Sequence, residues 1–269
     1  MTSFFSRNSF LAISGSIFAI FLMTSNVHAA SIPLNTIKSG DLVRGETQSS
    51  VYYFGEDGMR YVFPNEKIYL TWYPDFKNVK WISDADLSLI QIGGNVTYKP
   101  GSKLIQIESD PMLYTLSKNG TLRAIDSDSL PKELYGSTWK KQIDLIPASL
   151  AKDYHKEGVI QLATQYSPVF EQKEAESINS DKSLHAAILI HITDSGYDVP
   201  TAHVVSGHAV RWINDGIKMH SASEWDRIWG SGTLSTGATF TKYFSEKGTW
   251  SYYSKYDEKA NVGGAIVVE

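Results

Sequence analysis

The chain has 269 residues, no cysteine and a formal net charge of −4 at pH 7. Without cysteine it can form neither a disulfide nor a thiolate metal site. The acidic balance argues against nucleic acid or an anionic membrane as a general partner, because either would require a basic patch.

The first 29 residues have the pattern of a secretory signal peptide. Arg7 supplies a positive charge, Phe10 to Met23 is almost wholly apolar, and Val27-His28-Ala29 ends in small residues. This apolar core of 14 residues is shorter than the roughly 20 residues that span a bilayer. We therefore predict cleavage near Ala29, no membrane span after cleavage, and a secreted or extracytoplasmic location at the cell surface or in the periplasm.

Residues 30–165 are predicted to form an α+β domain that contains a hairpin followed by a short helix. Val51 to Phe54 and Arg60 to Phe63 are strand-like and flank Asp57-Gly58, a strong hairpin turn because glycine tolerates positive φ. A short helix is expected from Glu66 to Tyr73, capped by Asn65.

The same plan recurs about 62 residues later. The second copy places Leu113 to Leu116, Asn119-Gly120, Ser127 and Tyr135 where the first copy has Val51 to Phe54, Asp57-Gly58, Asn65 and Tyr73. Stacking of such units buries apolar faces that one unit alone cannot bury. We therefore predict a duplicated hairpin–helix unit.

The first copy resembles a repeat of secreted and cell-surface bacterial proteins. The residues that carry the resemblance are Val51, Tyr52, Asp57, Gly58, Arg60, Val62, Phe63 and the run from Ile82 to Leu87. The resemblance implies an envelope setting and names no chemistry.

Residues 166–183 are polar and charged, and are predicted to form a linker, partly helical. Strand patterns return in residues 184–269, where several short apolar runs at regular spacing indicate a β-sandwich. Trp225 and Trp229 are four residues apart, which favours one face of a short helix that packs over this end of the sandwich. The predicted fold is mainly β.

Residues 184–269 resemble the plastocyanin–azurin (cupredoxin) family, a Greek-key β-sandwich. Val210 to Ile213 reads as a strand that ends in Asn214, and His220 follows where the family places its first histidine ligand. The matching positions of the last two strands are Gly248, Trp250, Tyr252, Gly264, Ile266 and Val268.

The ligand loop of that family runs from cysteine through histidine to methionine, and this chain has Ser254, Asp257 and Val262 at those positions. A type 1 copper site needs two imidazoles and a thiolate, and a serine hydroxyl cannot replace the thiolate. We therefore predict no metal, with His220, Ser254, Asp257 and Val262 as vestigial ligand positions. The alternative is a weakly bound divalent metal at His220 and Asp257, with His203 or His208 nearby.

No catalytic motif is convincing, and we predict that the protein is not an enzyme. Ser254, His220 and Asp257 lack the oxyanion hole and the oriented imidazole of a triad. The pairs Glu108 with Asp110 and Asp84 with Asp86 are interpreted as solvated surface rather than glycosidase carboxylates.

A set of large aromatic residues suggests either core packing or a sugar-stacking surface. The set consists of Trp72, Tyr73, Trp81, Trp139, Trp225 and Trp229. The chain is therefore predicted to bind a cell-wall polymer, a glycan or an envelope protein. A remodelled metal protein is the alternative.

Overall fold

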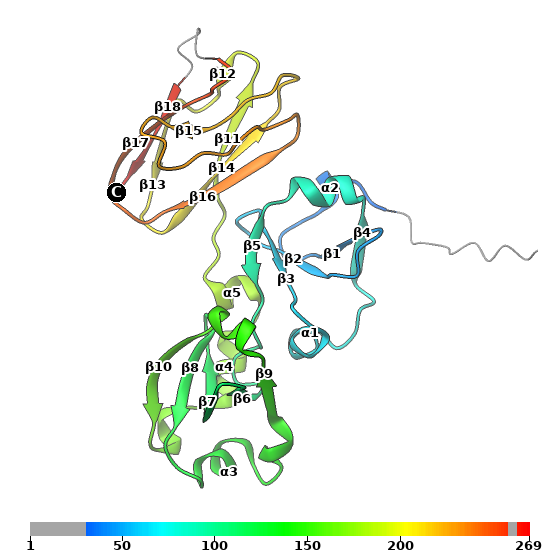
Figure 1. The fold of residues 1–269 in the computed structure, drawn as a ribbon, viewed down its shortest axis with the longest axis vertical. Coiled ribbons are helices and arrows are strands. Elements are labelled where there is room, and N and C mark those ends of the chain that lie inside the picture. The colour runs from blue at the N-terminus through cyan, green and yellow to red at the C-terminus, as the bar shows by residue number, and fades with distance from the viewer. Residues whose placement is uncertain (1–30, 258–262) are drawn as a thin grey trace, which may run out of the picture.

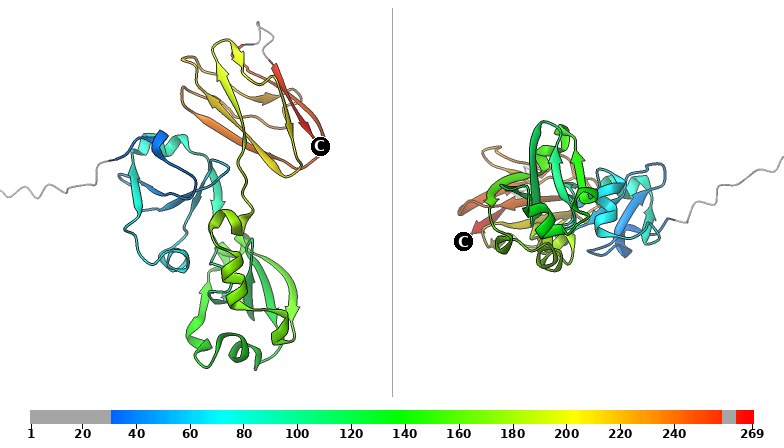
Figure 2. Two further views of the ribbon diagram at one scale, coloured as in Figure 1. Left: turned by 180° about the vertical axis from the view of Figure 1, so that it is seen from behind. Right: turned by 90° about the horizontal axis from the view of Figure 1, so that it is seen from below.

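The structure is a computed structural model that describes residues 31–257 and 263–269 (Figure 1). It is mainly β, with two sheet-and-helix units followed by a sandwich, and the view from behind separates these parts (Figure 2). The predicted signal peptide and Val262 lie outside the described residues. Within that described part, no helix combines the length and apolar character that crossing a membrane requires.

The first unit is a five-stranded sheet in the order β4-β1-β2-β3-β5. Its elements are η1 (Leu34–Thr36), β1 (Leu42–Gly45), β2 (Tyr52–Phe54), β3 (Arg60–Val62), α1 (Glu66–Trp72), β4 (Val79–Ile82), α2 (Asp84–Leu89) and β5 (Ile92–Asn95). The predicted helix after the hairpin forms because the side chain of Asn65 accepts a hydrogen bond from Ile68 N at 3.0 Å.

The second unit is a five-stranded sheet in the order β10-β8-β7-β6-β9. Its elements are β6 (Leu104–Ile107), β7 (Asp110–Ser117), β8 (Thr121–Ile125), α3 (Leu130–Tyr135), η2 (Trp139–Gln142), β9 (Ile143–Ile146), η3 (Ala148–Asp153) and β10 (His155–Ile160). The N-cap of α3 is Ser129, so Ser127 does not take over the capping role of Asn65. Pro131 in the first turn favours this later start.

The two sheets have the same connectivity. When β4-β1-β2-β3-β5 is set against β9-β6-β7-β8-β10, the elements match in chain order. The central pairs β1–β2, β2–β3, β6–β7 and β7–β8 are antiparallel, and the outer pairs β1–β4, β3–β5, β6–β9 and β8–β10 are parallel.

Residues 166–183 hold two short helices, α4 (Pro168–Glu174) and α5 (Ile178–Lys182), after η4 (Ala163–Gln165). The side chain of Asn179 in α5 accepts a hydrogen bond from Glu56 N at 3.1 Å and donates to Ser39 Oγ at 2.8 Å in the first unit. Asp181, two residues further on, accepts a hydrogen bond from Asn119 N at 3.0 Å in the second unit. The helix α5 therefore connects the two units.

The C-terminal part is a sandwich of two four-stranded sheets, in the orders β12-β11-β14-β16 and β13-β18-β17-β15. Its strands are β11 (Ile188–Thr193), β12 (Gly196–Tyr197), β13 (Thr201–Val204), β14 (His208–Asn214), β15 (Ser223–Glu224), β16 (Thr239–Phe244), β17 (Gly248–Tyr253) and β18 (Gly263–Val268). Trp212 of one sheet is fully buried and meets Tyr252 of the other edge-on, with ring centroids 5.3 Å apart.

The first unit contacts the sandwich along β16, an edge strand. The side chain of Gln91 hydrogen-bonds to Thr241 as a strand would, donating to its carbonyl at 3.1 Å and accepting from its N–H at 2.8 Å. This pairing satisfies main-chain groups that an open sheet edge would leave free.

The buried carboxylate of Asp57 is the second contact between the first unit and the sandwich. It accepts hydrogen bonds from Tyr61 Oη at 2.5 Å, from Tyr243 Oη of β16 at 2.6 Å and from Met59 N at 3.1 Å. The guanidinium of Arg211 lies beside it, and a Cβ on Gly58 would sit 1.6 Å from Arg211 Nη1. Gly58 therefore serves both the turn, where its φ is +77°, and the close approach of Arg211.

Replacing Asp57 with alanine is expected to lower the free energy of unfolding by about 3 kcal/mol, because two hydroxyls and a half-buried guanidinium lose their partner. Tyr243→Phe removes one of these hydrogen bonds and is expected to cost about 1 kcal/mol. Urea unfolding measures both. Tyr256→Phe, at a tyrosine that is half exposed, is the matched control, and a cost for Tyr243→Phe no greater than for this control would contradict the role of Asp57.

Asp181 makes the stability of the fold depend on pH. It is 1% exposed, and burial raises its pKa from 3.8 to about 6. The folded state thus binds the proton more tightly than the unfolded state, so its stabilising effect is complete below about pH 4 and is lost as the pH rises through about 6.

Asp181→Asn mimics the protonated carboxyl. The variant is expected to exceed the native protein in free energy of unfolding by on the order of 2 kcal/mol at pH 7.5, and by nothing near pH 4. Urea unfolding across this range measures the difference. Asp75→Asn is the control, since Asp75 is only partly buried and its bond to Lys77 lowers the pKa of its carboxyl. A gain for Asp181→Asn that is the same at every pH would contradict this account.

Candidate functional site

His220, the predicted first ligand position, lies between β14 and β15 at one end of the sandwich. Its backbone pairs with Leu234, through His220 N to Leu234 O at 3.0 Å and Leu234 N to His220 O at 2.8 Å. The buried side chain of Asn214 closes the preceding loop by donating to Lys218 O and Leu234 O, each at 2.8 Å. The position of the imidazole is therefore fixed by main-chain contacts on both sides.

The imidazole of His220 lies between two carboxylates. Its Nδ1 is 2.8 Å from Asp257 Oδ2 and its Nε2 is 3.3 Å from Asp194 Oδ1, while the side chain is 1% exposed. A neutral imidazole carries one N–H, so donation to both carboxylates requires a proton on each ring nitrogen. This arrangement suits a structural network between the ring and the two carboxylates.

Ser254 and Asp257 form a turn after β17. Ser254 Oγ accepts hydrogen bonds from Ser221 N at 3.3 Å and Tyr256 N at 3.4 Å, and Lys255 N donates to Ser221 Oγ at 2.9 Å. The structure thus brings Ser254 and Asp257 to the segment that carries His220. Val262, the fourth predicted position, lies outside the described residues.

These side chains do not fit a type 1 copper ion, which the family resemblance would imply. Both ring nitrogens of His220 are bonded to carboxylates, and Ser254 offers a hydroxyl bonded to backbone N–H groups where a thiolate is needed. Residues 31–257 and 263–269 contain no group of three or more His, Cys, Asp and Glu side chains that could hold a metal ion.

The two other histidines considered as neighbours have different partners. His203 Nδ1 pairs with Glu269 Oε1 at 2.9 Å, and the ring of His208 stacks on His185 with centroids 4.9 Å apart. Asp257 and Asp194 contact opposite ring nitrogens of His220. The two carboxylates therefore do not face one common position at which an ion could contact both of them and a ring nitrogen.

The triad-like set does not have triad geometry, because Ser254 Oγ accepts from backbone amides and His220 bonds to carboxylates at both nitrogens. In the paired carboxylates, hydrogen bonds to the side chains of Lys156 and Tyr114 lower the pKa of Asp110 to about 2. The hydroxyl of Thr47 lowers the pKa of Asp84. A glycosidase acid needs a raised pKa instead.

The predicted helix at Trp225 and Trp229 is wrong. The chain turns here, with Arg227 at φ 63°, and the two tryptophans point to different surroundings. Trp225 is 55% exposed and stacks on Tyr253, with ring centroids 4.3 Å apart. Trp229 packs on Trp212 in the sandwich, with centroids 5.4 Å apart.

The predicted aromatic set is spread over several elements and does not form one surface. Trp72 of α1 donates to Thr97 O at 2.8 Å, and Trp81 of β4 lies under the guanidinium of Arg44. Tyr73 packs against a core that residues of both units share, and Trp139 packs against a second core within its own unit.

Asp194 is the residue of this site that the sequence analysis missed. Its sequence context, just after β11 and before Gly196, is that of an ordinary turn. The parallel pairing of β11 with β14, in which Ile192 is opposite Asn214, carries Asp194 to the loop before His220. This long-range register leaves no local signal in the sequence.

Comparison with known proteins finds no matching family model and no matching curated protein. Among solved structures, a purple cupredoxin from Nitrosopumilus maritimus is 23% identical over 30% of this chain and 99% of that chain, with a TM-score of 0.29. An oxidised mutant of amicyanin is 25% identical over 31% of this chain and 82% of that chain, also with a TM-score of 0.29.

The first of these structures is a cupredoxin, the family that residues 184–269 resemble in sequence. In these residues, two four-stranded sheets form a β-sandwich. Of the ligand positions that the resemblance assigns, the described ones, His220, Ser254 and Asp257, do not make a type 1 copper ligand set. No family model and no curated protein supports the cell-surface repeat, and that resemblance stays a prediction.

His220→Ala is expected to lower the free energy of unfolding by about 2 kcal/mol, because two carboxylates lose their buried partner. His203→Ala is the matched control, since it breaks an exposed pair that contributes about 0.5 kcal/mol or less. Thermal and urea unfolding give both values. Equal stability of the two variants would show that the His220 network does not stabilise the sandwich.

Proposed function

We propose that this chain is an exported, non-enzymatic binding protein of the cell envelope, in which the cupredoxin-like sandwich has lost its type 1 copper site. The observation that supports this most directly is the buried imidazole of His220, bonded to a carboxylate at each nitrogen. These bonds join the loop before β15 to the turn after β17 and to the loop after β11. The former ligand positions therefore stabilise the sandwich.

The contacts of the sandwich support a structural role. Its edge strand β16 is paired with the side chain of Gln91, and its Tyr243 donates to the buried Asp57 of the first unit. A sandwich held in this way positions the preceding units. The binding role is accordingly proposed for the two sheet-and-helix units.

Export is proposed from the leader-like pattern of residues 1–29, and the envelope setting from the first copy of the hairpin–helix unit. The formal charge of −4 favours a neutral or basic partner over a polyanion. A cell-wall polymer, a glycan or an envelope protein meets this condition.

A metal-binding role at His220 and Asp257 is the second candidate, because Asp257 Oδ2 lies 2.8 Å from His220 Nδ1. Oxygen donors of this kind suit a hard divalent ion. Such an ion would have to displace at least one of the two hydrogen bonds of the His220 ring.

Elemental analysis of the purified native protein, together with retention on isolated envelope material, tests the two candidates. The binding role predicts that the protein holds much less than one copper or other divalent ion per chain. It also predicts that the envelope material retains native protein, His220→Ala and the His203→Ala control equally. One tightly held copper per chain with an intense absorption in the red would overturn it. A different stoichiometric ion that His220→Ala loses would establish the metal role, and absence of native protein from the envelope pellet would remove support for binding.

A further inference from the structure

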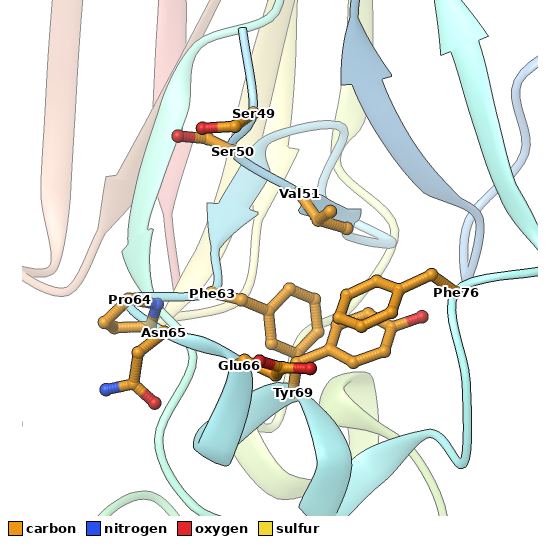
Figure 3. A pocket seen from close by; sticks show the side chains of 9 residues that line it. All are labelled: Ser49, Ser50, Val51, Phe63, Pro64, Asn65, Glu66, Tyr69 and Phe76. Atoms are coloured by element: carbon orange, nitrogen blue, oxygen red, sulfur yellow. The ribbon is translucent and has the colours of Figure 1, made fainter.

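The two sheet-and-helix units carry a groove in the same place. The first groove, of about 440 Å³, is lined by residues 49–51, 63–66, Tyr69 and Phe76 (Figure 3). The second, of about 770 Å³, is lined by residues 111–113, 125–128, Pro131, Trp139 and Lys140. Each lies between the start of one hairpin strand, the end of the next and the start of the following helix.

The correspondence holds residue by residue. Residues 49–51, 63–66 and 69 of the first groove are each 62 positions before residues 111–113, 125–128 and 131 of the second. Phe76 is 63 positions before Trp139, so each groove also has an aromatic ring from the segment after its helix. A hollow that recurs in this way belongs to the architecture of the unit.

The first groove presents an apolar platform with acceptors around it. Phe76 is 43% exposed and lies flat on Tyr69, with centroids 4.1 Å apart and planes 10° apart. Tyr69 is fixed by its bond to Asp75 O at 2.8 Å. Figure 3 shows the carboxylate of Glu66 in front of these rings and the hydroxyl of Ser50 across the groove.

The second groove has the same chemistry with different side chains. Trp139 and Met112, which is 41% exposed, supply apolar surface. Asp126 and Asp128 supply acceptors, and Lys140 is 5.6 Å from the ring of Trp139. Each groove thus has one net negative charge among its lining residues, from Glu66 in the first and from two aspartates against Lys140 in the second.

We propose that the two grooves are paired binding sites for a glycan of neutral or amino sugars, an assignment that rests on the binding function proposed above. The apolar face of a sugar ring packs on an exposed aromatic ring. Its hydroxyl or ammonium groups donate to the carboxylates around the platform. The net negative lining disfavours phosphate-rich or uronic-acid polymers.

Two sites on one chain give a polymer an advantage over a short oligosaccharide. Once one groove is occupied, the second meets the same glycan at high local concentration, which raises affinity by about 100-fold or more. In the view of Figure 1, α1 and α3 both lie at the lower ends of their units, away from the sandwich. The sandwich therefore leaves this end of both units open.

The test is calorimetric titration and co-sedimentation of the full mature chain with N-acetylglucosamine and glucosamine hexamers, long chitosan and polygalacturonate. Phe76→Ala and Trp139→Ala are each expected to reduce affinity for long chitosan by about 100-fold, and the double variant to abolish binding. Phe170→Ala and Trp225→Ala remove exposed rings outside both grooves, 59% and 55% exposed, and are the matched controls. Urea unfolding verifies that every variant is folded.

Three outcomes would overturn the glycan assignment: no binding of native protein to the hexamers or chitosan, equal affinity of groove and control variants, or tighter binding to polygalacturonate. Retention on envelope material separates this assignment from the proposed function. If the double variant is retained as well as native protein, the envelope-binding function holds and the grooves are not its site. If native protein is not retained, the proposed function itself fails.

Discussion

The carboxylate of Asp57 is the interaction on which the arrangement of the first unit and the sandwich depends. It accepts hydrogen bonds from its own hairpin and from Tyr243 of β16, and it lies beside the half-buried Arg211 of β14. A buried charge is tolerated only when it is paired and hydrogen-bonded, so these groups require one another. Because Gly58 has no side chain, the guanidinium can reach this position, and the turn of the hairpin is at the same time the point of docking.

At the other end of the sandwich, hydrogen bonds connect the loop that carries His220 with the turn after β17. His220 and Asp257 join the loop before β15 to the turn after β17, and Ser254 adds backbone hydrogen bonds between the same segments. A metal ion fixes such loops through a few strong bonds to deprotonated ligands. Here hydrogen bonds that involve carboxylates, a hydroxyl and backbone amides hold these segments together. Ser254 and Asp257 therefore have defined partners, although neither is a suitable copper ligand.

The parts of the fold that sequence could predict are those with local causes. The dipeptides Asp57-Gly58 and Asn119-Gly120 predicted the two hairpin turns, because glycine and asparagine tolerate positive φ. Asn65 predicted the start of α1, because its side chain caps the helix. The sites that sequence missed depend on distant pairing. Asp194 reaches His220 through the register of β11 with β14, and Asp57 meets Tyr243 across 186 positions. The four-residue spacing of Trp225 and Trp229 suggested a helix, but Trp229 is drawn into the sandwich core by Trp212 while Trp225 stacks outward on Tyr253.

The shared connectivity of the two units explains why their grooves coincide although their side chains do not. Strand order, hairpin turns and the start of the helix determine where the hollow forms, so the groove survives changes in the residues that line it. Tyr69 in the first groove corresponds to Pro131 in the second, and Phe76 to Trp139. The first platform is therefore a stacked pair of rings and the second a larger single indole beside a cation. Two such sites can differ in the sugar that each prefers and still engage one chain, because the backbone sets their placement and the side chains set their selectivity.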